Sequence, residues 1–123
     1  MQTFNEYQKE AVKLRMSTDK IRARYPDMDK DLLKLIAVTY DGLGLGESGE
    51  VQGKLKKIIR DAGGVITPEA IEEIKKELGD VLWYVASMCD TLGISMQDVA
   101  TGNINKLQGR HKRGTLEGSG DNR

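Results

Sequence analysis

Two pairs of acidic residues stand at the same spacing in the middle of the chain. Glu47 and Glu50 form one pair, and Glu77 and Asp80 form the other. On an α-helix, residues three apart lie on one face with Cβ atoms about 5–6 Å apart, so each pair presents two carboxylates side by side. The turn signal at residues 61–64 predicts two antiparallel helices, which can bring the pairs face to face.

Four carboxylates in one small space repel one another and lose hydration, so this arrangement needs a cation at its centre. Hard divalent cations prefer oxygen ligands, and Mg²⁺ is the expected occupant, with Mn²⁺ as a substitute. The alternative interpretation is that the acids are surface residues paired with Lys54 or Lys76. Against it, Glu77 and Asp80 lie next to the apolar stripe of their helix. The solvated face of that helix carries Glu72, Glu73, Lys75 and Lys76.

The composition limits the fold and the partners. The chain has 123 residues, of which 38% are hydrophobic and 31% charged, which suits a single domain whose core is completed by subunit association. The formal net charge is zero, so neither a nucleic-acid nor a membrane partner is expected. The single Cys89, the lack of an apolar run of about 18 residues and an N-terminus unlike a signal peptide predict a cytoplasmic location.

Apolar residues at helical spacing predict an all-α fold, an antiparallel bundle of four to five helices completed by dimerisation, as a homodimer or a dimer of dimers. Helices are expected over residues 4–16, from 29 or 31 to 62, over 68–92 and from 95 to about 111. The segment 17–29 is expected to be a connector, because Tyr25-Pro26-Asp27 is a turn signal. Phe4 and Tyr7 are interpreted as packing residues or as aromatics that stack on a base.

Glycines at positions 42, 44, 46, 49 and 53 surround the first acidic pair. Each costs about 1 kcal/mol relative to Ala inside a helix. Either the helix breaks near Gly42, or a long helix uses its glycines for close contact with a neighbouring helix and for space beside the carboxylates.

A family resemblance rests on the segments around the two acidic pairs. Gly44-Leu45-Gly46-Glu47-Ser48-Gly49-Glu50-Val51, followed by Glu77-Leu78-Gly79-Asp80-Val81-Leu82, resembles the ExxE…ExxD signature of the MazG-like nucleotide pyrophosphohydrolases. This superfamily of all-α NTP pyrophosphatases includes dimeric dUTPases, dCTP pyrophosphatases and phosphoribosyl-ATP pyrophosphohydrolases. The resemblance covers roughly residues 32–107 and favours the long helix. It implies Mg²⁺-dependent hydrolysis of a (d)NTP between the α- and β-phosphates, giving (d)NMP and pyrophosphate.

The resemblance also implies roles for single residues. The motif acids of the resembling enzymes are metal ligands, so the cation is expected on Glu47, Glu50, Glu77 and Asp80, with Glu47 as the candidate base toward the attacking water. Lys54 lies one turn beyond Glu50 and is expected to contact the phosphates. Positions that resemble nucleotide contacts of the family are Tyr84, Asn103 and Lys106. Core packing explains Tyr84 equally well.

The last helix and the tail carry two further expectations. The helix is expected to turn Met96, Val99, Ala100, Ile104 and Leu107 inward. The domain is expected to span residues 1–113, with 114–123 as a flexible Gly/Ser-rich tail. The basic segment from Arg110 to Arg123 is expected to fold over a nucleotide site, of its own or of a neighbouring subunit, with Lys112 or Arg113 contacting phosphate.

Two enzyme classes are excluded by missing motifs, and two alternatives remain. A di-iron carboxylate bundle needs ExxH pairs, whereas the single His111 follows no such Glu. A P-loop NTPase needs a GxxxxGK[ST] stretch, which the chain lacks. One alternative is a non-catalytic helical dimerisation module, which leaves the glycines beside an acidic pair unexplained. The other is a related pyrophosphohydrolase with a narrower substrate such as dUTP, dCTP or phosphoribosyl-ATP.

Overall fold

The computed structural model describes residues 3–15 and 17–123, and within these ranges the protein is all-α, as predicted. The elements are α1 (Phe4–Ala11), η1 (Val12–Leu14), α2 (Ser17–Arg24), α3 (Lys30–Gly44), η2 (Leu45–Glu47), α4 (Ser48–Asp61), α5 (Pro68–Leu92) and α6 (Met96–Arg113), where η marks a 3₁₀ turn. The dimerisation that was expected to complete the bundle stays a prediction.

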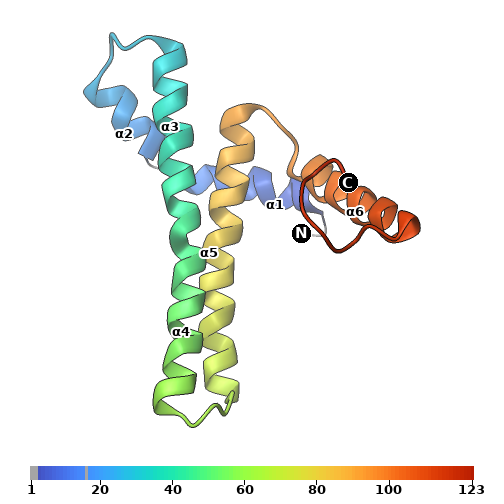
Figure 1. The fold of residues 1–123 in the computed structure, drawn as a ribbon. Helices are drawn as coiled ribbons and strands as arrows, with labels where there is room; N and C mark the ends of the chain where they lie inside the picture. Colours follow the sequence, from blue (N-terminus) through green and yellow to red (C-terminus); the bar gives the residue numbers. More distant parts are fainter. Residues whose placement is uncertain (1–2, 16) are drawn as a thin grey trace.

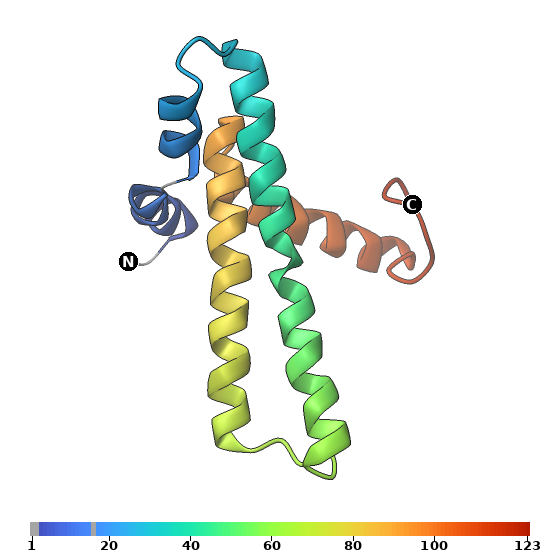
Figure 2. The same cartoon turned by 90° about the vertical axis from the view of Figure 1, so that its left-hand side faces the viewer.

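An antiparallel pair of long rods forms the centre of the fold. Figures 1 and 2 show α3, η2 and α4 following one another along a single rod beside α5. The chain turns back through Gly63 and Gly64, whose φ angles of 61° and 78° lie in the left-handed region that glycine adopts without strain. Thr67 then caps α5 with its side chain, and Pro68 occupies the first turn, as predicted.

The buried core lies where α1 crosses α5 (Figure 1). Thr3 and Glu6 form the predicted capping box that starts α1. The indole N–H of Trp83 on α5 donates to the carbonyl of Ala11 at 3.2 Å. The buried core residues are Ala11, Ala86, Cys89 and Met96. This small core fixes α1 against the upper half of α5.

The segment expected to be a connector contains the helix α2. The apolar residues of α2 are Ile21 and Ala23 alone, so the sequence has no apolar stripe that would predict a helix here. Contact with α3 supplies the missing stabilisation. The helix ends at Arg24, because Tyr25 precedes a proline and is disfavoured in helical conformation. The first helix is also shorter than predicted, and Met16 lies outside the described residues.

The glycine-rich segment neither breaks at Gly42 nor forms one uninterrupted α-helix. Helix α3 continues to Gly44, tightens into η2 and resumes as α4. A Cβ atom at Gly44 would overlap the ring of Tyr84 on α5, so the expected close helix contact is confirmed at this glycine. At Gly46, Gly49 and Gly53 a Cβ atom would meet no other described atom within 4 Å.

Helix α6 points away from the two rods and packs on α1 and the end of α5 (Figure 1). Met96 is buried as expected, but Val99, Ile104 and Leu107 are exposed. The prediction that these three face inward is therefore wrong within one chain, because no other described element covers that side of α6.

The segment 114–123 folds back along α6 without regular secondary structure. The guanidinium of the buried Arg110 donates to the carbonyl of Gly120 at 3.2 Å and to that of Asp121 at 2.9 Å. Arg123 donates to the carbonyls of Thr115 and Leu116 at 3.1 Å each. These bonds tie the tail to its own helix, while its flexibility stays a prediction.

A buried carboxyl group joins α3 to α5. Asp41 is 3% exposed, and the hydroxyl of Thr91 lies 3.4 Å from its Oδ2. Arg15 donates to the same hydroxyl at 3.0 Å and forms an ion pair with Asp90 at 3.0 Å. Burial raises the pKa of Asp41, and the nearby charge of Arg15 only partly opposes this.

This raised pKa predicts a pH-dependent contribution to stability. A group whose pKa is higher in the folded than in the unfolded state adds to the free energy of unfolding. This contribution is complete at a pH below the unfolded-state pKa and is lost as the pH rises through the folded-state pKa. We therefore expect Asp41→Asn to raise Tm by a few degrees at pH 7, with a difference that shrinks toward pH 4. Thermal melts between pH 4 and 8 measure this, with Asp90→Asn as a destabilising control. A pH-independent difference would contradict the assignment.

Candidate metal centre

Three of the four predicted acids come together between η2 and α5. Glu47, Glu77 and Asp80 each offer a carboxylate oxygen, and these three oxygens lie within 4.8 Å of one another. Glu47 and Glu77 are half-buried, and Asp80 is exposed. Carboxylates this close repel one another, and a cation bound by all three relieves the repulsion. A donor set made only of oxygen atoms suits a hard divalent cation. The residues therefore fit the implied Mg²⁺.

The local structure explains how these side chains meet. Glu77 and Asp80 are one turn apart on α5 and share a face. Glu47 ends the 3₁₀ turn η2, which packs on α5. Three residues earlier, Gly44 lets the ring of Tyr84 lie against the rod. The close approach of the two rods at Gly44 thus brings Glu47 beside the second acidic pair.

Glu50 is not part of this group in the part of the chain that the structure describes. It is exposed in the first turn of α4, and its charge acts on Lys54. Both acids of the first pair were expected on one face of a regular helix, but the pair spans the junction of η2 and α4. Glu47, which was expected as a ligand and as the candidate base, lies with Glu77 and Asp80. The roles of ligand and base stay predictions.

Lys54 connects α4 to α5 through an ion pair that the sequence did not indicate. Its Nζ lies 2.8 Å from Glu73 and 3.9 Å from Glu77. The hydrogen bond raises the pKa of Lys54 and lowers that of Glu73. Glu73 lies on the exposed face of α5, as expected, and it also pairs with Lys54 across the two helices. The available signal was its position four residues before Glu77, which places both on one face.

Tyr7 of α1 is electrostatically coupled to Asp80 of the acidic cluster. Tyr7 is half-buried, and its burial, together with the charge of Asp80, raises the pKa of its hydroxyl. Tyr7 therefore lies within electrostatic range of the cluster while also packing against the core. Both interpretations of its ring, packing and contact with a base, remain compatible with this position.

Tyr84 stands beside the site in a packing role. Its ring lies edge-on to that of Trp83, with centroids 5.0 Å apart and an interplanar angle of 86°. The same ring occupies the space over Gly44. Packing alone thus accounts for the position of Tyr84, and its contact with a nucleotide stays a prediction.

The remaining predicted nucleotide contacts lie on α6, away from the acids. They are Asn103, Lys106, Lys112 and Arg113. Among the described helices, α6 contacts α1 and α5, and it also contacts its own tail. Lys106 lies 3.6 Å from Asp121, and Arg113 donates to the carbonyl of Arg123 at 2.9 Å. The structure therefore does not bring these residues to the acidic cluster of the same chain.

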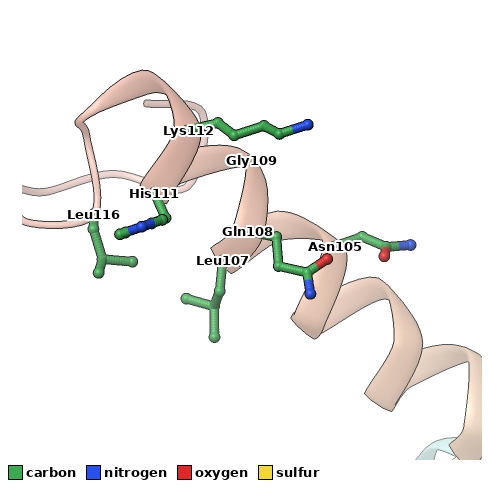
Figure 3. Close-up of a pocket in the computed structure, with 7 residues that line it drawn as sticks. All are labelled: Asn105, Leu107, Gln108, Gly109, His111, Lys112 and Leu116. Carbon is green, nitrogen blue, oxygen red and sulfur yellow. The ribbon is translucent and has the colours of Figure 1, made fainter.

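Two cavities lie outside the acidic cluster. A groove of about 740 Å³ runs along the end of α6 and the tail, with Leu107, His111 and Leu116 on one side and Gln108 and Asn105 on the other (Figure 3). A smaller cleft of about 310 Å³ opens between α4 and α5 and is lined by Lys54 and Glu73, among others. Among the described lining residues of both cavities, none is one of the three clustered acids, and Lys54 at the smaller cleft lies 3.9 Å from Glu77.

The fold and the site define an all-α protein that gathers carboxylates from two antiparallel helical rods. Residues 42–115, more than half of the chain, match the MazG nucleotide pyrophosphohydrolase domain, so the chain belongs to this family. It is also 49% identical over 87 residues to the Gene 37 protein of Mycobacterium phage L5, a match that covers 70% of this chain and 76% of that protein. No solved structure matches the chain.

The family match confirms the resemblance drawn from the two acidic motifs, since all four motif acids lie inside the matched range. It supports nucleotide pyrophosphohydrolase activity in general. Among the helices described, none is long and apolar enough to cross a membrane.

Proposed function

We propose that this protein is a Mg²⁺-dependent nucleoside triphosphate pyrophosphohydrolase. It cleaves a (d)NTP between the α- and β-phosphates and releases (d)NMP and pyrophosphate, with Mn²⁺ able to replace Mg²⁺. Family membership supports the class of reaction. The observation that carries the metal requirement is the convergence of Glu47, Glu77 and Asp80 within 4.8 Å.

The chain's own residues divide the work in the following way. Glu47, Glu77 and Asp80 would hold the cation, and the exposure of Asp80 leaves the cluster accessible to a triphosphate. The cation supplies charge neutralisation for the phosphates and activation of the attacking water. Glu50 lies outside the cluster and is free to accept a proton from that water. Lys54, beside Glu77, adds a positive charge for the phosphates.

A panel of canonical and modified triphosphates tests this proposal. Each is incubated with the protein and Mg²⁺ and assayed for released pyrophosphate. The panel includes dUTP, dCTP and phosphoribosyl-ATP, because a cation on the acidic cluster would contact the phosphates and leave the choice of base to other residues. We expect pyrophosphate from at least one member, and release from none would contradict the proposal.

Exposed apolar surface supports a homodimer as the functional form. The chain exposes 9076 Å², whereas a compact monomer of this mass exposes about 6,600 Å². Leu43 on α3 is 73% exposed and Ile59 on α4 is 76% exposed, and α6 adds Val99 and Ile104. A second copy would cover such faces. It would also allow α6 of one subunit to approach the acidic cluster of the other, which would bring Asn103, Lys106, Lys112 and Arg113 toward a nucleotide.

Sedimentation at micromolar concentration checks the assembly. We expect a mass of about 27 kDa, twice that of one chain. Leu43→Glu should shift the mass toward the 13.6 kDa of the monomer, because it places a charge on an apolar face. Lys75→Glu on the solvated face of α5 is the matched control and should leave the dimer intact. A monodisperse wild-type monomer would count against the dimer.

A further inference from the structure

One lysine of α4 lies between two carboxylates of α5. Lys54 Nζ is 2.8 Å from Glu73 Oε2 and 3.9 Å from Glu77 Oε1. Glu73 and Glu77 are one turn apart on the same face, so a single ammonium faces both. Glu77 belongs to the acidic cluster, whereas Glu73 is outside it.

This position makes Lys54 a competitor for the cation site. An ammonium on a flexible four-carbon stem moves easily. If its bond to Glu73 were lost, the other carboxylate in ion-pair range would be Glu77. An ammonium that settled on Glu77 would occupy a ligand of the cluster and repel a divalent cation.

We propose that Glu73 is a positioning residue of the metal centre. By holding Lys54, Glu73 keeps the ammonium off Glu77 and preserves the cation site, while a positive charge remains at its rim for a phosphate. Glu73 acts through Lys54 and contacts neither cation nor substrate. This inference rests on the proposed function, because it assumes that Glu47, Glu77 and Asp80 bind a divalent cation.

Mn²⁺ titration of the nucleotide-free protein, by calorimetry or by the EPR signal of free Mn²⁺, tests the inference without reference to activity. We expect Glu73→Gln to weaken Mn²⁺ binding about three- to tenfold, because the released Lys54 moves onto Glu77. Lys54→Met should strengthen binding about tenfold, since it removes a positive charge beside the cluster. The matched controls are Glu72→Gln and Lys75→Met. They alter an exposed ion pair of α5, in which Lys75 Nζ lies 3.6 Å from Glu72 Oε2, and both variants should bind Mn²⁺ like the wild type.

The double variant Lys54→Met/Glu73→Gln separates positioning from simple charge. Loss of a negative charge near a cation site weakens binding by itself, and that effect would persist without the lysine. We expect the double variant to bind Mn²⁺ as tightly as Lys54→Met alone. An equal loss from Glu73→Gln in both backgrounds, or no loss in either, overturns the inference. Wild-type protein that binds no Mn²⁺ would overturn the proposed metal centre and this inference together. Binding by the wild type with unchanged Glu73→Gln would overturn this inference alone.

Discussion

Replacing Asp80 by Asn should remove catalysis and cation binding together while leaving the helices intact. Asp80 supplies one of three oxygens within 4.8 Å, and Asn keeps the shape of the side chain but removes its charge. We expect kcat/KM to fall by about 10³-fold or more, which corresponds to about 4 kcal/mol of transition-state stabilisation. Without metal, Tm should stay unchanged or rise, because one of three mutually repelling carboxylates is gone.

Glu50→Gln provides the matched comparison for this variant. We expect a comparable loss of kcat with Mn²⁺ affinity close to that of the wild type, because Glu50 lies outside the cluster. Initial rates and Mn²⁺ titrations on both variants measure the difference. Full activity of Asp80→Asn would show that the site is wrongly placed. Loss of Mn²⁺ binding in Glu50→Gln would show that Glu50 is a metal ligand.

A methyl group at Gly44 should destabilise the fold by about 1–3 kcal/mol and lower Tm by about 4–12 °C. The added Cβ would overlap the ring of Tyr84, which packs edge-on against Trp83 and resists displacement. The strain arises where the ring of Tyr84 packs on Gly44, three residues before Glu47. We therefore expect activity to fall together with stability.

The control for this variant is Gly102→Ala on α6. A Cβ atom there meets no described atom within 4 Å, so the substitution should gain about 0.5–1 kcal/mol from helix propensity. In a Tyr84→Ala background, the cost of Gly44→Ala should disappear. Thermal melts compare the wild type with the three single variants and the double variant. Equal behaviour of Gly44→Ala and Gly102→Ala would mean that the ring of Tyr84 moves away freely.

The features that could be predicted from the sequence depend on residues close together in the chain. The caps at Thr3, Asp29, Thr67 and Ser95 each accept a backbone N–H within three residues, so their signals are local. The same holds for the glycines that end α5 and α6. Glu77 and Asp80 could be placed on one face because α5 is a long regular helix.

The features that could not be predicted depend on tertiary contacts. Helix α2 is stabilised by α3 rather than by an apolar stripe of its own. The 3₁₀ turn at η2 separates Glu47 from Glu50, and the ring of Tyr84 against Gly44 belongs to the packing at this junction. The ion pair of Lys54 with Glu73 joins two helices whose relative register no local pattern specifies.

Product analysis tests the central claim most directly. The responsive triphosphate is incubated with the protein and Mg²⁺, and the products are separated by anion exchange and identified by ³¹P NMR. We predict nucleoside monophosphate and pyrophosphate in equal amounts, with formation abolished by a chelator and by Asp80→Asn. Nucleoside diphosphate and orthophosphate, or turnover that persists in the chelator, would contradict a metal-dependent pyrophosphohydrolase at this site.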